Sequence, residues 1–383
     1  MIEKLGRQCC GCSACANACP KSCITMRENE EGFLYPQVQQ ELCVHCGLCE
    51  KACPILCPPQ PEEAACREAW GVTCKDQALL LDSSSGGLFS LLAEEVLRQG
   101  GCVFGAAFSG DFEKVKHIKV TTPTEMGALR GSKYVQSDMN TCYRQAKQEL
   151  LSGRTVLFSG TPCQIAGLKA YLGQPCEKLI CADIICHGVP SPALWRAYLR
   201  QLEKQLGGNA DFVSFRSKKN GWQKYGLLVQ CGAQSYFQGR MQEPYLKIFI
   251  RNYCLRESCF QCFAKGSNSP SDITIGDFWG VGRIAPDLNN ELGVSLALLH
   301  TEKGRALFSQ VLPKLSAGRL DYGAAVRRNS AFSRSVRRPK ERDLFFSDFH
   351  SLAWDEIAKK YGRDNLKIRV RRVLGKIKRK ILS

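Results

Sequence analysis

The stretch CCGCSACANACP, residues 9–20, contains cysteines at the spacing CxxCxxCxxxCP. The same spacing recurs in CVHCGLCEKACP, residues 43–54, with each position shifted by 34 residues. Three thiolates spaced in this way can bind one face of a 4Fe-4S cluster, while the fourth reaches a second cluster. The sequence therefore predicts two clusters with exchanged ligands. The first set is Cys9, Cys12, Cys15 and Cys53, and the second set is Cys43, Cys46, Cys49 and Cys19.

Zinc sites and disulfide frameworks are the alternatives for so many cysteines. Zinc favours paired CxxC units separated by a longer loop, with four ligands at each site rather than eight interlaced ones. The interlaced pattern is typical of a bacterial two-cluster ferredoxin domain, which we expect over residues 1–57. Three further cysteines in this segment, Cys10, Cys23 and Cys57, are expected to pack beside the clusters without binding iron.

The composition indicates a globular protein in a reducing environment. A chain of 383 residues can form the small cluster domain and a larger body with its own core. Eleven of the 23 cysteines fall in the first 57 residues, and the others lie mostly in apolar runs. No apolar stretch approaches the ~18 residues of a membrane span, and the N-terminus lacks the apolar core of a signal peptide. A cytoplasmic location is expected because oxidising compartments would threaten clusters and thiols.

Positive charge gathers at the C-terminus. The net charge is +17, and eight Lys or Arg without any acid lie between Lys367 and Lys380. Apolar residues recur there at helical spacing, so residues 336–383 are expected to form a basic helical tail. Such a helix suits an anionic membrane surface or an acidic partner, or it packs on its own domain with a solvated basic face. Nucleic-acid binding is not expected, since no aromatic residues interleave the basic run.

Between these ends, strands alternate with helices. Residues 58–69 are rich in proline and acid and are expected to be a linker, and residues 70–335 form the body. Strands are expected over 102–108, 156–158, 179–185, 212–215, 227–230, 273–275 and 294–299. The predicted fold is a ferredoxin-like domain followed by a mixed α/β body, with strand pairs inserted and no Rossmann regularity.

Three polar loops in the body could bind an anionic ligand. Ser85, Gly86 and Gly87 open a helix, where free N–H groups and the helix dipole favour a phosphate, although an ordinary serine cap fits as well. Gly131, Ser132, Lys133 and Tyr134 add a charge and a ring, or form a surface turn. Ser159, Gly160 and Thr161 follow a buried strand, where α/β folds place ligand loops.

The body resembles a known family. The segments SSSGGLFS, RGSKYVQS, LFSGTPCQIAGL, CHGVPSP, the CxxC pair of Cys259 and Cys262, and SDITIGDFWG occur in this order. Over roughly residues 70 to 310 they look like the beta subunit family of coenzyme F420 hydrogenases and dehydrogenases. The resemblance implies bound FAD, for which the three polar loops are the candidate residues. It also implies a further iron–sulfur cluster in the body.

Four cysteines are candidate ligands of that third 4Fe-4S cluster: Cys163, Cys186, Cys259 and Cys262. Alternatively, the first two are buried small residues, and the CxxC pair binds zinc or nothing. Beside Cys186, His187 could donate a proton near the flavin, although the sequence favours a structural histidine there. No other catalytic residue is predicted.

Together these features predict an iron–sulfur flavoprotein oxidoreductase. Electrons would pass from a ferredoxin-like donor through the clusters to FAD and a small hydride-accepting molecule. The alternative is a non-catalytic electron-transfer subunit that connects a partner enzyme to its donor. A cluster-based sensor that binds nucleic acid is disfavoured, because no DNA-binding motif is present. The sequence does not identify the hydride acceptor.

Overall fold

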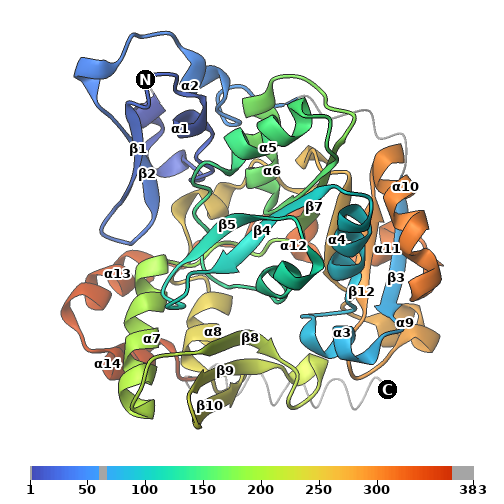
Figure 1. The fold of residues 1–383 in the computed structure, drawn as a ribbon. Helices are drawn as coiled ribbons and strands as arrows, with labels where there is room; N and C mark the ends of the chain where they lie inside the picture. The colour runs from blue at the N-terminus through green and yellow to red at the C-terminus, as the bar shows by residue number, and fades with distance from the viewer. Residues whose placement is uncertain (1, 60–66, 365–383) are drawn as a thin grey trace.

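The N-terminal region carries both cysteine motifs on short elements around one hairpin. The computed structural model describes residues 2–59 and 67–364. The hairpin pairs β1 (Ile24–Glu28) antiparallel with β2 (Leu34–Val38). Its other elements are η1 (Ile2–Gln8), α1 (Ala14–Ala18), η2 (Gln40–Leu42) and α2 (Leu48–Lys51). Figure 1 shows this region in blue, with α1 beside α5 (Cys142–Leu151) and α6 (Pro162–Leu172) of the body.

An eight-stranded mixed sheet forms the centre of the body. Its order is β13-β3-β12-β11-β7-β6-β4-β5, in which β11, β7, β6 and β4 run parallel to one another and the outer strands are antiparallel. The strands are β3 (Glu68–Cys74), β4 (Cys102–Phe108), β5 (Val115–Val120), β6 (Val156–Gly160), β7 (Leu179–Ile184), β11 (Ile273–Asp277), β12 (Ser295–Leu299) and β13 (Leu315–Leu320).

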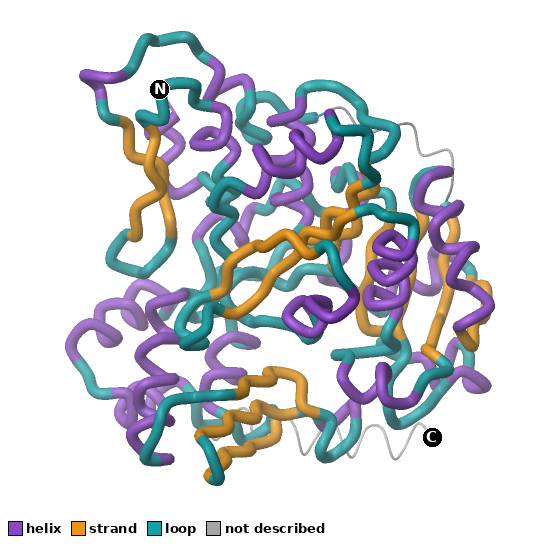
Figure 2. Tube along the Cα trace, in the orientation of Figure 1, coloured by secondary structure: helices purple, strands orange, loops and turns teal. Residues whose placement is uncertain are grey.

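Helices cover both faces of this sheet (Figure 2). Successive strand residues point to opposite faces, so Val103 and Leu157 pack with α4 (Leu88–Arg98) and α10 (Glu302–Val311), whereas Phe104 and Phe158 pack with α5 (Cys142–Leu151) and α6 (Pro162–Leu172). Short elements join these layers: α3 (Gln77–Asp82), η3 (Pro123–Leu129), α9 (Val281–Ile284), η7 (Pro286–Leu288), η8 (Leu312–Lys314), α11 (Tyr322–Arg327) and α12 (Ser330–Ser333).

A second core lies beside the central sheet. Here β8 (Phe212–Ser217), β9 (Gly226–Cys231) and β10 (Gln234–Gly239) form an antiparallel meander. Four helices pack around the same aromatic cluster: α7 (Pro192–Leu206), α8 (Pro244–Ile250), α13 (Arg342–Ser351) and α14 (Trp354–Tyr361). The rings of Tyr198 and Trp354, for example, stack with centroids 4.2 Å apart. The connections include η4 (Trp222–Lys224), η5 (Glu257–Gln261) and η6 (Gly266–Asn268).

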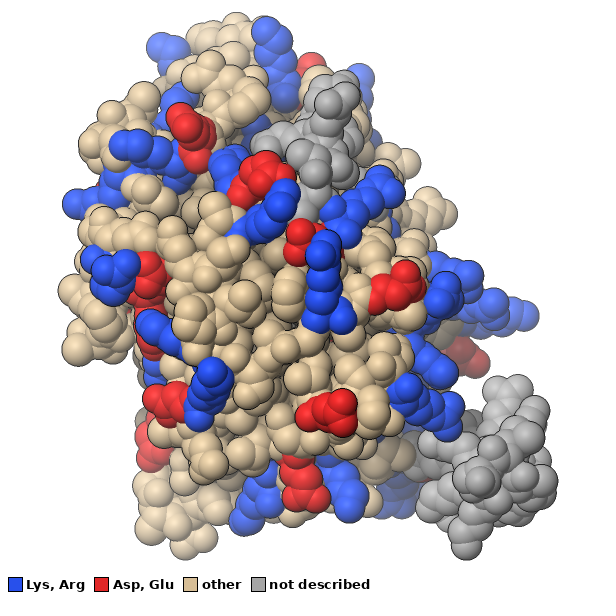
Figure 3. Space-filling model, turned by 90° about the vertical axis from the view of Figure 1, so that its right-hand side faces the viewer, with Lys and Arg blue, Asp and Glu red and all other residues tan. Residues whose placement is uncertain are grey.

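The fold agrees with the class predicted from the sequence, a mixed α/β body after a ferredoxin-like region. Helices α13 and α14 fall within the expected C-terminal tail and pack into the second core, but the basic run from Lys367 to Lys380 lies outside the described residues. On the face in Figure 3, basic and acidic side chains are interspersed. In the described part of the chain, no helix is long and apolar enough to cross a membrane.

Candidate functional site

The first predicted ligand set is buried at the junction with the body. Cys9, Cys12, Cys15 and Cys53 are each at most 8% exposed. Burial raises the pKa of Cys15 to about 12, and the neighbouring thiols of Cys9 and Cys53 act in the same direction. The second motif thus places Cys53 beside cysteines of the first motif, as an exchange of ligands requires.

The second predicted ligand set surrounds a cavity of about 110 Å³. Cys19 lines it together with Cys43, Cys46 and Cys49, so one cysteine of the first motif again faces three of the second. Cys46 is exposed, whereas Cys43 and Cys49 are half-buried. Four thiols around one hollow are the donor set that a 4Fe-4S cluster uses, and this site therefore fits such a cluster near the surface.

The described residues contain no group of three or more Cys, His, Asp or Glu side chains that converges on a single metal ion. In a 4Fe-4S cluster each thiolate binds a different iron, so its ligands stand around the cluster and need not meet at one point.

The four candidates for a third cluster also lie together. Cys163 is near the start of α6, Cys186 follows β7, and Cys259 and Cys262 lie at η5. Burial raises the pKa of the Cys186 thiol, and the thiols of Cys259, Cys163 and Cys262 raise that pKa further. Because groups affect one another in this way only when they are close, the four sulfurs lie near one another. This group is consistent with a cluster site in the body.

Polar groups from the surrounding loops face this third cysteine group. The Oγ1 atom of Thr161 lies 3.2 Å from the sulfur of Cys163, and the N–H of Val189 donates to the sulfur of Cys259 over 3.5 Å. Nearby, Lys265 donates to the carbonyl of Cys186. A backbone N–H such as that of Val189 can stabilise negative charge on the sulfur that accepts it.

A cavity of about 520 Å³ lies at the carboxyl ends of β6, β7 and β11. Each of the three polar loops that the sequence singled out contributes to its wall. The lining residues among them are Ser85, Gly87, Gly131, Ser132, Lys133, Tyr134, Ser159, Gly160 and Thr161. Ligand sites in α/β proteins form at this edge of a sheet, and the convergence supports one shared site.

Gly86 lies behind this wall. Its N–H donates to the Oγ atom of Ser295 over 2.8 Å, and an added Cβ would lie 2.3 Å from the carbonyl oxygen of Val72. The loop of Ser85, Gly86 and Gly87, here called the serine–glycine loop, can therefore pack against β3 and β12 because Gly86 has no side chain. Gly87 is the N-cap of α4, with a φ of 81°, and it offers no side chain to accept from the first-turn N–H groups.

The cavity wall favours an anion. Lys133 donates from Nζ to the carbonyls of Arg130 and Gly131, over 2.8 and 3.2 Å, and loss of solvation lowers the pKa of Lys133 to about 7. Arg216 pairs with Asp277 at 2.8 Å, and its guanidinium lies 3.8 Å from the ring centroid of Tyr225. Together with the first turn of α4, these cations suit a phosphate-bearing ligand.

Two histidines also line the cavity. His187 lies beside Cys186, its Nε2 is 2.7 Å from the Oδ1 of Asn252, and burial lowers its pKa. His117, which the sequence did not single out, is held by its Nε2 at 2.9 Å from the carbonyl of Ser159. Burial lowers the pKa of His117 to about 4, so this ring is neutral near pH 7.

Two further basic residues lie near the loops but not in the cavity wall. Lys218 donates to the carbonyls of Leu80 and Ser85 over 2.6 and 2.9 Å and thereby holds the serine–glycine loop. Lys219 lies 5.4 Å from the ring centroid of Phe237 and does not line the cavity.

The N-terminal region contacts the body through many backbone groups. Arg144 of α5 donates to the carbonyls of Ala16, Asn17 and Cys19 over 2.7 to 2.9 Å. On α6, an added Cβ at Gly167 would lie 2.9 Å from the sulfur of Cys12. The first cysteine set thus rests directly on the helix that carries Cys163.

Comparison with known proteins agrees with this arrangement. Residues 8–57 match the model of the 4Fe-4S dicluster domain, and residues 153–321 match the model of the C-terminal part of the coenzyme F420 hydrogenase/dehydrogenase beta subunit. The resemblance predicted from the sequence is thereby confirmed. One chain thus contains a region similar to a 4Fe-4S dicluster domain and a region similar to the C-terminal part of these beta subunits.

Among solved structures, the chain is similar to one from the F420-reducing NiFe hydrogenase complex of Methanosarcina barkeri. The identity is 14% and the TM-score 0.46, over 71% of this chain and 93% of that chain. No match was found among the curated proteins.

Proposed function

We propose that the protein is an iron–sulfur flavoprotein oxidoreductase that connects a ferredoxin-like electron donor to a small hydride-accepting molecule. The observation that carries this proposal is the 520 Å³ cavity, whose wall collects three loops from distant parts of the sequence beside the third cysteine group. Bound clusters would supply single-electron transfer, and bound FAD would supply the conversion to hydride transfer.

The protein's own residues would then have distinct tasks. The two N-terminal ligand sets and the set of Cys163, Cys186, Cys259 and Cys262 would hold the clusters. The first turn of α4, Ser85 and Lys133 would bind the phosphates of FAD, because uncapped N–H groups and a cation both favour an anion. His187 remains the candidate for moving a proton, since its ring lines the cavity beside Cys186.

A non-catalytic electron-transfer subunit is the second candidate, because the matched family model describes a beta subunit. In that case the donor's electrons would leave through a partner enzyme. The two candidates differ in whether the chain itself binds a flavin in an accessible cavity.

Titration of the anaerobically purified full chain with FAD tests the proposal. We expect Lys133→Ala to weaken FAD binding by roughly 1–3 kcal/mol, the contribution of one charge-assisted hydrogen bond, with iron content unchanged. Lys219→Ala is the matched control, since Lys219 is exposed and does not line the cavity. A cluster-replete protein that contains no flavin and binds none would refute the flavoprotein and favour the electron-transfer subunit.

A further inference from the structure

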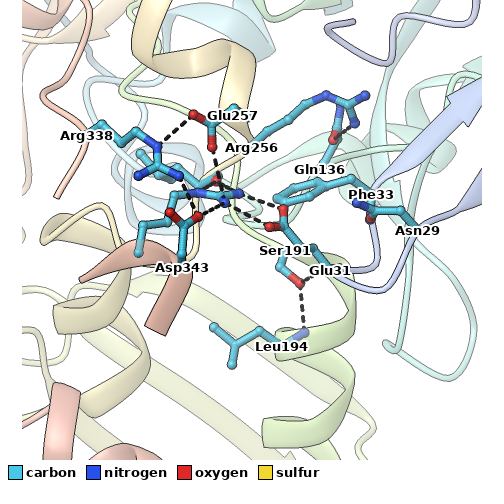
Figure 4. Close-up of polar contacts among 12 residues, drawn as sticks. Asn29, Glu31, Phe33, Gln136, Ser191, Leu194, Arg256, Glu257, Arg338 and Asp343 are labelled. Atoms are coloured by element: carbon cyan, nitrogen blue, oxygen red, sulfur yellow. Dashed lines mark hydrogen bonds and ion pairs between the residues drawn. The ribbon is translucent and has the colours of Figure 1, made fainter. Parts of the chain in front are cut away.

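Arg256 is a fully buried cation at the junction of the N-terminal region and the body. It lies just before η5, and its side chain is 0% exposed. Nε donates to the carbonyl of Cys9 over 2.7 Å, Nη1 to the Oε1 of Gln136 over 3.0 Å, and Nη2 to the carbonyl of Leu34 over 2.9 Å. Figure 4 shows the side chain extending to Gln136.

All three of these acceptors are uncharged, and Arg256 forms no ion pair with any residue in the described ranges. The acidic residues nearby are paired with other arginines. Glu31 binds Arg342 at 2.6 Å, and Glu257 binds Arg338 at 2.7 Å (Figure 4). The guanidinium also lies 4.2 Å from the ring centroid of Tyr35 and 5.4 Å from that of Phe33, but neither ring carries a net charge. A buried cation without a counter-ion is unfavourable, so this environment favours a nearby anion.

The guanidinium lies directly against the loop between two predicted cluster ligands. An added Cβ at Gly11, between Cys9 and Cys12, would lie 2.8 Å from Nη1 of Arg256. On its other side, the backbone carbonyl of Arg256 accepts the N–H of Cys259 over 3.0 Å. Arg256 thus contacts the loop of the first cysteine set through its guanidinium and Cys259 of the third set through its backbone carbonyl.

We propose that Arg256 is the counter-ion of the clusters on either side of it and raises their reduction potentials. The inference rests on the proposed ligand sets. Four thiolates make each cluster anionic, and one electron from the donor adds a further negative charge without a proton or a broken bond. A fixed buried cation stabilises the reduced cluster more than the oxidised one, as charge and hydrogen bonding around a cluster do in general. Arginine suits this position because it stays protonated when buried.

The test is a redox titration of the full chain, followed by electron paramagnetic resonance, for wild type, Arg256→Gln and Arg256→Lys. We expect Arg256→Gln to lower the ratio of reduced to oxidised cluster about tenfold at a fixed potential, a shift of about 59 mV for one electron. Arg256→Lys retains the charge and should shift the potential much less. The control is the double variant Glu31→Gln with Arg342→Gln, which removes a buried ion pair at the same junction without changing the net charge.

The outcomes separate the two proposals. If the wild type lacks the first or the third cluster, the ligand sets proposed above are wrong. The proposed role of Arg256 as a counter-ion is then wrong as well. If Arg256→Gln retains its iron and has wild-type reduction potentials, the proposed role of Arg256 is refuted while the proposed function stands. The same conclusion follows if the control variant shifts the potentials equally. If Arg256→Gln loses its clusters, the Arg256→Lys variant provides the test. A reduction potential near that of the wild type would support the charge effect, and a large negative shift would contradict it.

Discussion

Substitution of Gly167 tests how closely the N-terminal cluster region packs against the body, because helix propensity and steric overlap act in opposite directions at this residue. The residue lies within α6, where glycine to alanine normally stabilises a helix by about 1 kcal/mol. Here, however, the new methyl group would lie 2.9 Å from both Cβ and Sγ of Cys12 and 3.0 Å from the hydroxyl of Tyr143. Overpacking of this kind costs about 1–3 kcal/mol.

Neither neighbour of Gly167 can move away easily. The hydroxyl of Tyr143 donates to the carbonyl of Gln164 over 2.7 Å, and Cys12 lies in the loop that Arg256 and Gln136 hold. We therefore expect Gly167→Ala to lower the free energy of unfolding by about 1 kcal/mol, the overlap outweighing the helical gain. The resonance spectrum of the first cluster should also change, since its ligand Cys12 is displaced.

Anaerobic urea unfolding, followed by tryptophan fluorescence, measures this effect. Gly323→Ala in α11 is the control, because its added Cβ would meet its nearest neighbours only at 3.4 Å. That substitution should be neutral or stabilising. If Gly167→Ala is as stabilising as the control and leaves the cluster spectrum unchanged, the close packing of α6 on Cys12 is wrong.

Three further predictions concern the cofactor sites. Cys19→Ser should damage the cluster on Cys43, Cys46 and Cys49, and selective loss of the other N-terminal cluster in resonance spectra would contradict the exchange of ligands. Cys259→Ser should lower the iron content of the full chain by up to ~4 atoms while both N-terminal clusters stay; unchanged iron would exclude Cys259 as a ligand. Because the pKa of Lys133 is lowered to about 7, its charge is present below that pH and lost above it. FAD affinity should therefore fall as the pH rises through about 7, and an equal fall in Lys133→Ala would rule out this lysine as the cause.

Local patterns in the sequence were sufficient for much of the fold. The buried strands β4, β6, β7 and β12 are nearly continuous apolar runs, and capping residues and glycines delimit helices such as α4 and α7. The three polar loops were also visible, because glycine and serine follow strands or open a helix there. These signals depend on neighbours in the sequence, which is why they could be found without the structure.

Features that depend on distant pairing were not predictable in this way. His117 reaches the cavity only because β5 pairs with β4 and sets the ring beside Ser159. The strand of His117 alternates basic and apolar residues and carries no sign of a ligand site. Likewise, Arg256 is one arginine among many in the sequence, and its isolation from acids appears only when the hairpin and the body meet.

The analysis of iron and flavin in the anaerobically purified full chain tests the central claim most directly. We expect about twelve iron atoms per chain, from three 4Fe-4S clusters, together with one FAD. About eight iron atoms and no flavin, in protein that also takes up none when FAD is added, would contradict the oxidoreductase and leave an electron-transfer subunit with two clusters.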